Sequence, residues 1–346
     1  MSTTVGKTAT LLIHTKTLLS RGFFLYNSQK GVNDMMYSPK KTFSIAGLAL
    51  FAAVAGSAVF SMLILTPLYM ANDGASMKKL VEGGYASVMV LFTYVPLVLA
   101  LLIFWLIIRL IPKGEPGSSQ FSFAWLFQVF LMGYGVSTVL NVVGTMLNKS
   151  TGGADSVGDI SSMISTGLVV TFLIPVVIGP ILEELLFRKL LIDRIRRFGE
   201  WNAVLFSALA FGLFHMNLPQ FCYAASVGLM LGYVYVKTGR ILYTIIMHIL
   251  LNGASSLIVL ATTGGSVKAS IILLSAAAIL IIVFVISGII LFFVKRKKIQ
   301  FDSDMPDAIP SNEVFRTAYL NPGVILYYAY CILMVVLALL NISLAG

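Results

Sequence analysis

Long, nearly uncharged apolar runs dominate this chain and constrain its fold more than any other feature. A helix of about 20 apolar residues crosses a hydrocarbon core of about 30 Å. Only 11% of the 346 residues are charged, whereas soluble domains have about 25%. A soluble enzyme, a disordered chain and a fibrous protein are therefore excluded. We expect an all-α polytopic membrane protein with about nine transmembrane helices.

The nine expected spans divide the chain into four parts. They run over 43–70, 86–111, 122–147, 162–187, 201–217, 219–237, 240–261, 269–294 and 323–344. Residues 1–42 form a cytoplasmic N-terminal tail, and residues 43–160 hold accessory transmembrane helices. We expect a four-helix core in 161–262. The C-terminal transmembrane helices follow in 263–346, where an acidic segment near 299–321 is expected to be a solvated cytoplasmic linker.

Positive charge is distributed unevenly between the two sides of these spans. If the N-terminus is cytoplasmic, 20 of the 24 Lys and Arg residues fall in cytoplasmic segments, and only Lys78, Lys79, Lys149 and Lys268 do not. Cytoplasmic loops carry an excess of Lys and Arg, so the pattern predicts a cytoplasmic N-terminus. The net charge of +10 therefore favours contact with membrane lipids. No basic module that would bind nucleic acid is present in the sequence.

Two adjacent carboxylates, Glu183 and Glu184, lie among apolar residues near the end of the fourth span. Ionisable groups at membrane depth cost about 2.5–3.5 kcal/mol on insertion scales and commonly mark functional sites. Neighbouring side chains on a helix point about 100° apart, so the two carboxylates are not expected to share one task. Arg188 follows Glu184 by four residues, where an ion pair forms on one helical face. We assign Glu184 and Arg188 to this pair and Glu183 to chemistry; the swapped assignment is the alternative.

Two of the three histidines lie inside apolar helices. His215 closes the sequence Phe-Gly-Leu-Phe-His that begins at Phe211, and Asn252 lies one turn after His248 on the same helical face. A lone intramembrane histidine is a helix–helix hydrogen-bonding residue about as often as a catalytic one. Two histidines, an asparagine and a Glu–Glu pair on three nearby helices favour a shared functional site.

These residues resemble the three motifs of the CPBP intramembrane proteases, a family that includes the type II CAAX prenyl proteases and the bacteriocin-processing or self-immunity (Abi) proteins. The motifs are E-E-x-x-x-R at Glu183, Glu184 and Arg188, F-x-x-x-H at Phe211 and His215, and H-x-x-x-N at His248 and Asn252. The resemblance covers about residues 165–260. It implies an intramembrane endopeptidase that hydrolyses a peptide bond of a membrane-associated or lipidated peptide or protein.

Peptide-bond hydrolysis needs an activated water and a site for the developing oxyanion. The resemblance implies that Glu183 is the general base and that His215 holds the same water. It also implies that His248 and Asn252 donate hydrogen bonds to the oxyanion. Glu184, Arg188 and Phe211 would then support this site, which uses no cofactor.

A zinc site is the alternative arrangement of the same residues. Glu183, His215 and His248 would bind Zn²⁺ and leave one position open for water, because three N/O ligands are a normal catalytic set. Residue types leave both arrangements open. The sequence lacks an H-E-x-x-H helix, and Asn252 is a poor zinc ligand, so the metal-free arrangement is favoured.

The expected helix ends place the candidate residues at different depths. Glu183 and His248 would lie roughly 8–12 Å from the cytoplasmic interface at ~1.5 Å per residue. His215 lies fifteen residues beyond Glu200, which corresponds to about 22 Å. Either the fifth helix begins above the membrane, or residues 189–200 dip into it.

Two other functions would use the same residues. A non-enzymatic scaffold or immunity protein of the same family would keep the motifs without turnover. A proton-coupled transporter would use the buried Glu and His side chains as a relay. The absence of an ER retrieval or organelle signal favours a bacterial plasma membrane and a peptide-processing role over eukaryotic CAAX processing.

Overall fold

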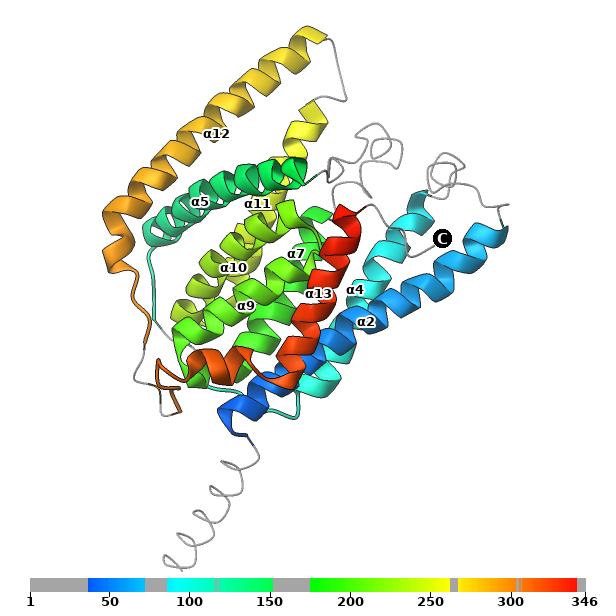
Figure 1. The fold of residues 1–346 in the computed structure, drawn as a ribbon. Coiled ribbons are helices and arrows are strands. Elements are labelled where there is room, and N and C mark those ends of the chain that lie inside the picture. Colours follow the sequence, from blue (N-terminus) through cyan, green and yellow to red (C-terminus); the bar gives the residue numbers. More distant parts are fainter. Residues whose placement is uncertain are drawn as a thin grey trace, which may run out of the picture.

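The computed structural model describes residues 37–71, 86–151, 175–261 and 267–340, apart from 116, 118, 303, 304 and 306. Within these residues the protein consists of helices and their connections, with no strand (Figure 1). The predicted all-helical fold is therefore confirmed for the described part of the chain.

Each expected span overlaps a helix of the structure. The helices are α2 (Pro39–Ala71), α4 (Ala86–Ile108), α5 (Phe123–Ser150), α7 (Gly179–Glu184), α9 (Glu200–Phe214), α10 (Leu218–Thr238), α11 (Ile241–Ala261), α12 (Val267–Lys295) and α13 (Pro322–Leu339). Among the described residues, four stretches are long and apolar enough to cross a membrane: 39–64, 123–150, 267–298 and 322–339. The protein is thus an integral membrane protein. The count of nine spans, the cytoplasmic N-terminus and the bacterial membrane stay predictions.

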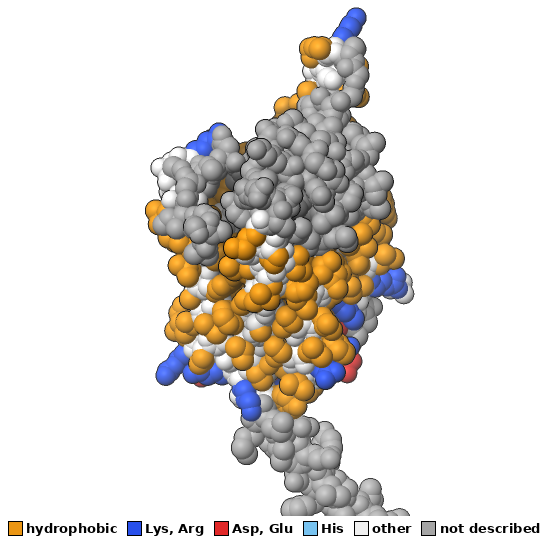
Figure 2. Space-filling view, turned by 90° about the vertical axis from the view of Figure 1, so that its right-hand side faces the viewer, with side chains coloured by type: hydrophobic (Ala, Val, Ile, Leu, Met, Phe, Trp, Pro, Cys, Tyr) orange, Lys and Arg blue, Asp and Glu red, His pale blue; other side chains and the backbone are white. Residues whose placement is uncertain are grey.

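The helices pack in neighbouring groups around the motif-bearing helices (Figure 1). α2 packs with α4 and α13 on one side, and α5 packs with α10 and α12 on the other. Large hydrophobic side chains remain exposed on these outer helices, and Figure 2 shows them covering the middle of one face, with Lys and Arg at its lower edge. An apolar belt bounded by positive charge is the surface that a lipid bilayer requires.

Local sequence explains where the helices begin. Asn217 caps α10 by accepting a hydrogen bond from the Gln220 backbone N–H at 2.9 Å, and Pro219 lies in the first helical turn. Asn321 caps α13 in the same way, with 3.1 Å to the Val324 N–H. A capping side chain satisfies a backbone donor that has no partner within the helix, and Pro has no N–H to lose there.

One helical segment runs from residue 175 to residue 198, beyond the predicted end of the fourth span at 187. It consists of a π-helical turn, α7, the π-helix η3 (Leu185–Ile192), α8 (Asp193–Ile195) and the 3₁₀ turn η4 (Arg196–Phe198). The segment stays inside the bundle because its apolar residues Leu191, Ile195 and Phe198 are fully buried. Of the two alternatives for the depth difference, this burial favours the one in which residues 189–200 dip inward.

Gly199 connects this segment to α9 with a φ of +116°, which side-chain-bearing residues rarely adopt. Glu183 lies sixteen residues before Gly199, and His215 lies sixteen residues after it. The two arms of the helical hairpin therefore bring Glu183 and His215 to a similar level. The predicted depth mismatch arose from ending the fourth helix too early.

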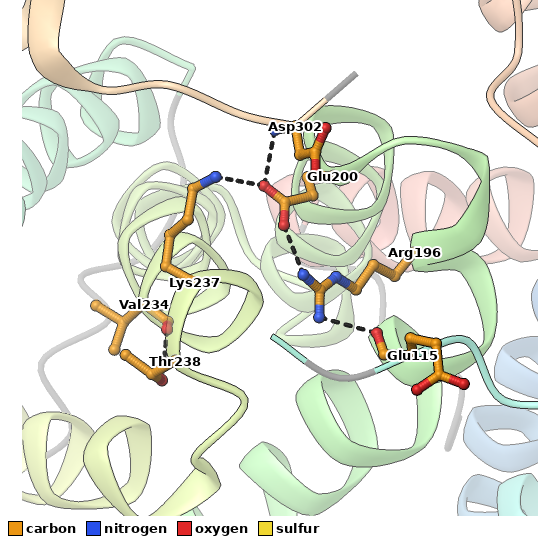
Figure 3. A network of polar contacts seen from close by, with 7 residues as sticks. All are labelled: Glu115, Arg196, Glu200, Val234, Lys237, Thr238 and Asp302. Carbon is orange, nitrogen blue, oxygen red and sulfur yellow. Dashed lines mark hydrogen bonds and ion pairs between the residues drawn. The ribbon is translucent and has the colours of Figure 1, made fainter. Parts of the chain in front are cut away.

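A network of ion pairs ties this hairpin to the rest of the protein (Figure 3). The Glu200 carboxylate accepts from Arg196 Nη2 and from Lys237 Nζ, both at 2.6 Å, and from the Asp302 backbone N–H at 2.9 Å. Arg196 Nη1 also donates to the backbone carbonyl of Glu115 at 3.0 Å. Acidic partners therefore compensate cationic residues that the sequence suggested were solvated.

The described part of the segment near 299–321 packs against the hairpin and α10. The ring of Phe301 lies 5.1 Å from that of Trp201 and 5.3 Å from that of Tyr233, measured between centroids. Arg197 Nε lies 3.3 Å from Asp307 Oδ2, and Ile309 is buried. Phe301 and Ile309 thus attach the segment to the bundle, whereas residues 310–313 are exposed, and its assignment as a cytoplasmic linker stays a prediction.

Candidate active site

Glu184 and Arg188 form the ion pair that their four-residue spacing predicts. Arg188 Nε lies 3.1 Å from Glu184 Oε2, and both side chains are completely buried. The Arg188 guanidinium also lies over the ring of Phe211, with 4.7 Å to its centroid. An aromatic face and a carboxylate thus compensate for removing this cation from water.

His248 lies between the two glutamates. Its Nδ1 is 2.9 Å from Glu184 Oε1, and its Nε2 is 3.6 Å from Glu183 Oε2. Both carboxylates thus contact one imidazole, through its two different nitrogens, and the expectation that they have different tasks stays a prediction. Flexible glutamate side chains can converge although their Cα–Cβ directions differ, since the two ring nitrogens lie on different edges of the ring.

Phe211 joins the two histidines. Its ring centroid lies 5.1 Å from that of His215 and 5.7 Å from that of His248, both in edge-on geometry. The two imidazole rings are therefore no farther apart than the sum of these distances. His215 also interacts electrostatically with Glu183 and His248. The structure thus brings both histidines to the Phe211 ring and Glu183 to His248.

The end of α9 determines where His215 lies. Met216, the next residue, has a φ of +52°, which is uncommon for a residue with a side chain. The Asn217 amide donates to the His215 backbone carbonyl at 2.9 Å before capping α10. This turn places His215 directly after the last residue of α9, instead of within a continuous helix.

Asn252 has a different environment from that expected. Its amide N–H donates to the backbone carbonyl of Pro175 at 3.0 Å and so links α11 to the beginning of the 175–198 segment. An Asn side chain has a second N–H, which remains suited to an oxyanion. Its proposed role in an oxyanion site stays a prediction.

Burial distinguishes the two glutamates. The Glu183 side chain is 14% exposed, whereas that of Glu184 is 0% exposed. Glu184 already has Arg188 and His248 as partners, so its carboxylate is a structural anchor. Glu183 is the less buried of the two.

Sequence reasoning missed two residues near these carboxylates. Thr244 is fully buried one turn before His248 and lies near Glu184, and its hydroxyl donates to the Ile241 carbonyl at 2.9 Å. Tyr94 on α4 interacts electrostatically with Glu183. The four-residue spacing from His248 could have indicated Thr244. Nothing in the sequence connects Tyr94 to a residue 89 positions away.

A metal-holding group of three or more His, Cys, Asp or Glu side chains does not occur among the described residues. The alternative zinc ligands Glu183, His215 and His248 are neighbours, but they do not surround a common position in this arrangement. Whether the reaction uses a metal stays a prediction.

Comparisons with known proteins agree with the motif resemblance. Residues 165–254 match the family model of type II CAAX prenyl endopeptidase Rce1-like proteins. The chain is also similar to the "Putative membrane peptidase YdiL" of Bacillus subtilis (strain 168), with 23% identity over 202 residues, which are 56% of this chain and 81% of that protein. No solved structure matches the chain significantly. The resemblance to CPBP-family proteases is thus confirmed, over the part of the chain that carries all three motifs.

Proposed function

We propose that this protein is an intramembrane endopeptidase whose site consists of Glu183, His215, His248 and Asn252. The observation that carries the proposal is the placement of both Glu183 and Glu184 on the two nitrogens of His248. Ionisable groups within an apolar bundle are costly to bury, and for that reason they commonly mark functional sites. The match of residues 165–254 to a peptidase family supports the same chemistry.

Glu183 is the general base in this proposal. Its partly exposed carboxylate can accept a proton from water, whereas Glu184 is buried with two partners. His215, which interacts electrostatically with Glu183, would hold the same water. A base and a second polar group on one water orient its lone pair toward a scissile carbonyl.

Glu184 positions His248. When Nδ1–H donates to Glu184, the other ring nitrogen is directed toward Glu183. His248 Nε2 would donate to the developing oxyanion when it carries a proton, together with the second N–H of Asn252. The same nitrogen lies near the proton that Glu183 takes from water, which the departing amine must eventually receive.

The proposed substrate is a membrane-associated or lipidated peptide. The family that matches is described by its action on CAAX prenyl proteins, and the Bacillus relative is described as a membrane peptidase. A site inside an apolar bundle favours substrates that are already attached to the membrane. We favour processing of bacterial peptides, by a metal-free reaction with zinc chemistry as the alternative.

Mass spectrometry of products tests the proposal. Purified protein in lipid nanodiscs is incubated with membrane-tethered peptides, with Glu183→Gln as the inactive variant and Glu313→Gln, an exposed glutamate, as the control. Discrete fragments that appear with wild type and Glu313→Gln, but not with Glu183→Gln, support the proposal. Proton-coupled flux without cleavage would instead indicate a transporter. A cellular phenotype that survives Glu183→Gln would indicate a scaffold.

A further inference from the structure

Two buried hydroxyl groups donate to backbone carbonyls of a different helix, one into α9 and one out of it. Tyr327 on α13 donates to the Ala210 carbonyl of α9 at 2.7 Å. Ser207 on α9 donates to the Phe187 carbonyl of η3 at 2.9 Å. The side chains of Tyr327 and Ser207 are completely buried.

These bonds are unusual in their direction. A buried Ser or Thr hydroxyl in a helix commonly bonds back to a carbonyl of its own helix. Ser137 does so with Tyr134 at 3.1 Å, and Ser226 does so with Tyr223 at 2.7 Å. Ser207 and Tyr327 instead connect different helices, by using the second lone pair of a carbonyl oxygen.

The two carbonyls belong to residues beside the aromatic cluster of the candidate site. Ala210 directly precedes Phe211, and the ring of Phe187 lies 5.1 Å from that of Phe211. Phe211 in turn contacts both imidazoles and the Arg188 guanidinium. A shift of α9 relative to η3 or α13 would therefore displace His215 relative to Glu183.

We propose that Tyr327 and Ser207 are positioning residues that hold Phe211, and through it the two histidines, in register with Glu183. This inference rests on the proposed peptidase function. It makes α13 a part of the working enzyme, although α13 lies outside residues 165–254 that match the family model. Neither residue contacts the reacting atoms.

Tyr327→Phe tests the first contact, because it removes only the hydroxyl. The matched control is Tyr328→Phe, since the neighbouring Tyr328 hydroxyl is buried without a hydrogen-bond partner among the described residues. We expect Tyr327→Phe to lower kcat about tenfold with little change in KM, because small misplacements of catalytic groups are costly. Tyr328→Phe should keep the wild-type kcat.

Ser207→Ala tests the second contact and serves if Tyr327→Phe does not fold. Its control is Ser137→Ala, which removes an equally buried hydroxyl that bonds within its own helix. Ser207→Ala should also lower kcat with KM unchanged, and Ser207→Thr, which retains the hydroxyl, should recover part of the loss.

Hydrogen exchange gives a readout that does not need turnover. Residues 185–192 and 211–215 should exchange faster in Tyr327→Phe and Ser207→Ala than in their controls. If wild type cleaves no peptide, the peptidase proposal fails. The positioning inference is then judged by hydrogen exchange alone: faster exchange in both variants supports it, and unchanged exchange refutes it. If kcat and exchange in both variants match those in the controls, the positioning inference is wrong even when the wild type is an active peptidase. A fall in thermal stability with unchanged kcat would also overturn it.

Discussion

Glu200→Gln tests whether buried charge holds the two motif helices together. Glu200 is 2% exposed and Arg196 is 8% exposed, and the carboxylate accepts from Arg196, Lys237 and the Asp302 backbone (Figure 3). Glutamine keeps the size of the side chain but leaves the two cations without their counter-charge. Removing one partner of a buried ion pair costs about 3–5 kcal/mol.

The expected cost lies at the lower end of that range. The Lys237 side chain is 19% exposed, so its ammonium can turn toward water, and its loss of the carboxylate contributes little to the change in the free energy of unfolding. Arg196 retains its bond to the Glu115 carbonyl, but within the described part of the chain its charge forms no other ion pair. We therefore expect the free energy of unfolding to fall by about 3 kcal/mol.

Thiol labelling gives a suitable assay. Cys331 is a free, buried cysteine, and Cys222 is a second, less buried one, so in a Cys222→Ser background the reaction of Cys331 with a fluorescent maleimide reports unfolding in detergent as denaturant is added. The control is Glu115→Gln, because the exposed Glu115 side chain takes no part in the network and only its backbone carbonyl does. Exposed substitutions of this kind usually change stability by less than about 0.5 kcal/mol. If Glu200→Gln unfolds within that margin of Glu115→Gln, the stabilising role of the network is refuted.

Three further predictions concern the site and the topology. Asn252→Ala should lower turnover on the order of 10²–10³-fold with little change in substrate binding if the site is metal-free; stoichiometric zinc in active protein, with activity lost to phenanthroline, would contradict this. Glu184→Gln should reduce stability by about 3–5 kcal/mol, measured by the same thiol labelling, because the buried Arg188 loses the carboxylate that lies 3.1 Å from its Nε. Cysteines introduced at positions 30 and 149 should be labelled from the cytoplasmic and the external side, respectively, and the reverse pattern would overturn the orientation.

Local sequence predicted the elements whose causes are local. The expected span at 219–237 matches α10, whose beginning Asn217 and Pro219 fix in the structure, and the four-residue spacing of Glu184 and Arg188 predicted their ion pair. The spacing of the three motifs also indicated which side chains belong to the candidate site. In each case the interacting groups lie within one helical turn, where helix geometry fixes their relation.

The remaining features depend on partners that are distant in sequence. Residues 188–198 carry several cations, so a solvated end was the natural expectation. Partners outside the segment help to bury them: Glu200 pairs with Arg196, and the Ile108 carbonyl accepts from Arg194. The contact of Glu184 with His248 spans 64 residues, and that of Tyr327 with Ala210 spans 117. The hydrophobic periodicity of a single segment cannot predict contacts between residues so far apart in the sequence.

The equal arms on either side of Gly199 make this protein sensitive to changes in length. Deleting one residue from α9 would move His215 by about 1.5 Å along the helix and turn it by about 100°. The same deletion on the opposite arm would move Glu183 instead. A single insertion or deletion between 183 and 215 should therefore inactivate the protein far more readily than a substitution at the same place. Grafting this hairpin into another membrane protein would require all 33 residues from 183 to 215 as one block.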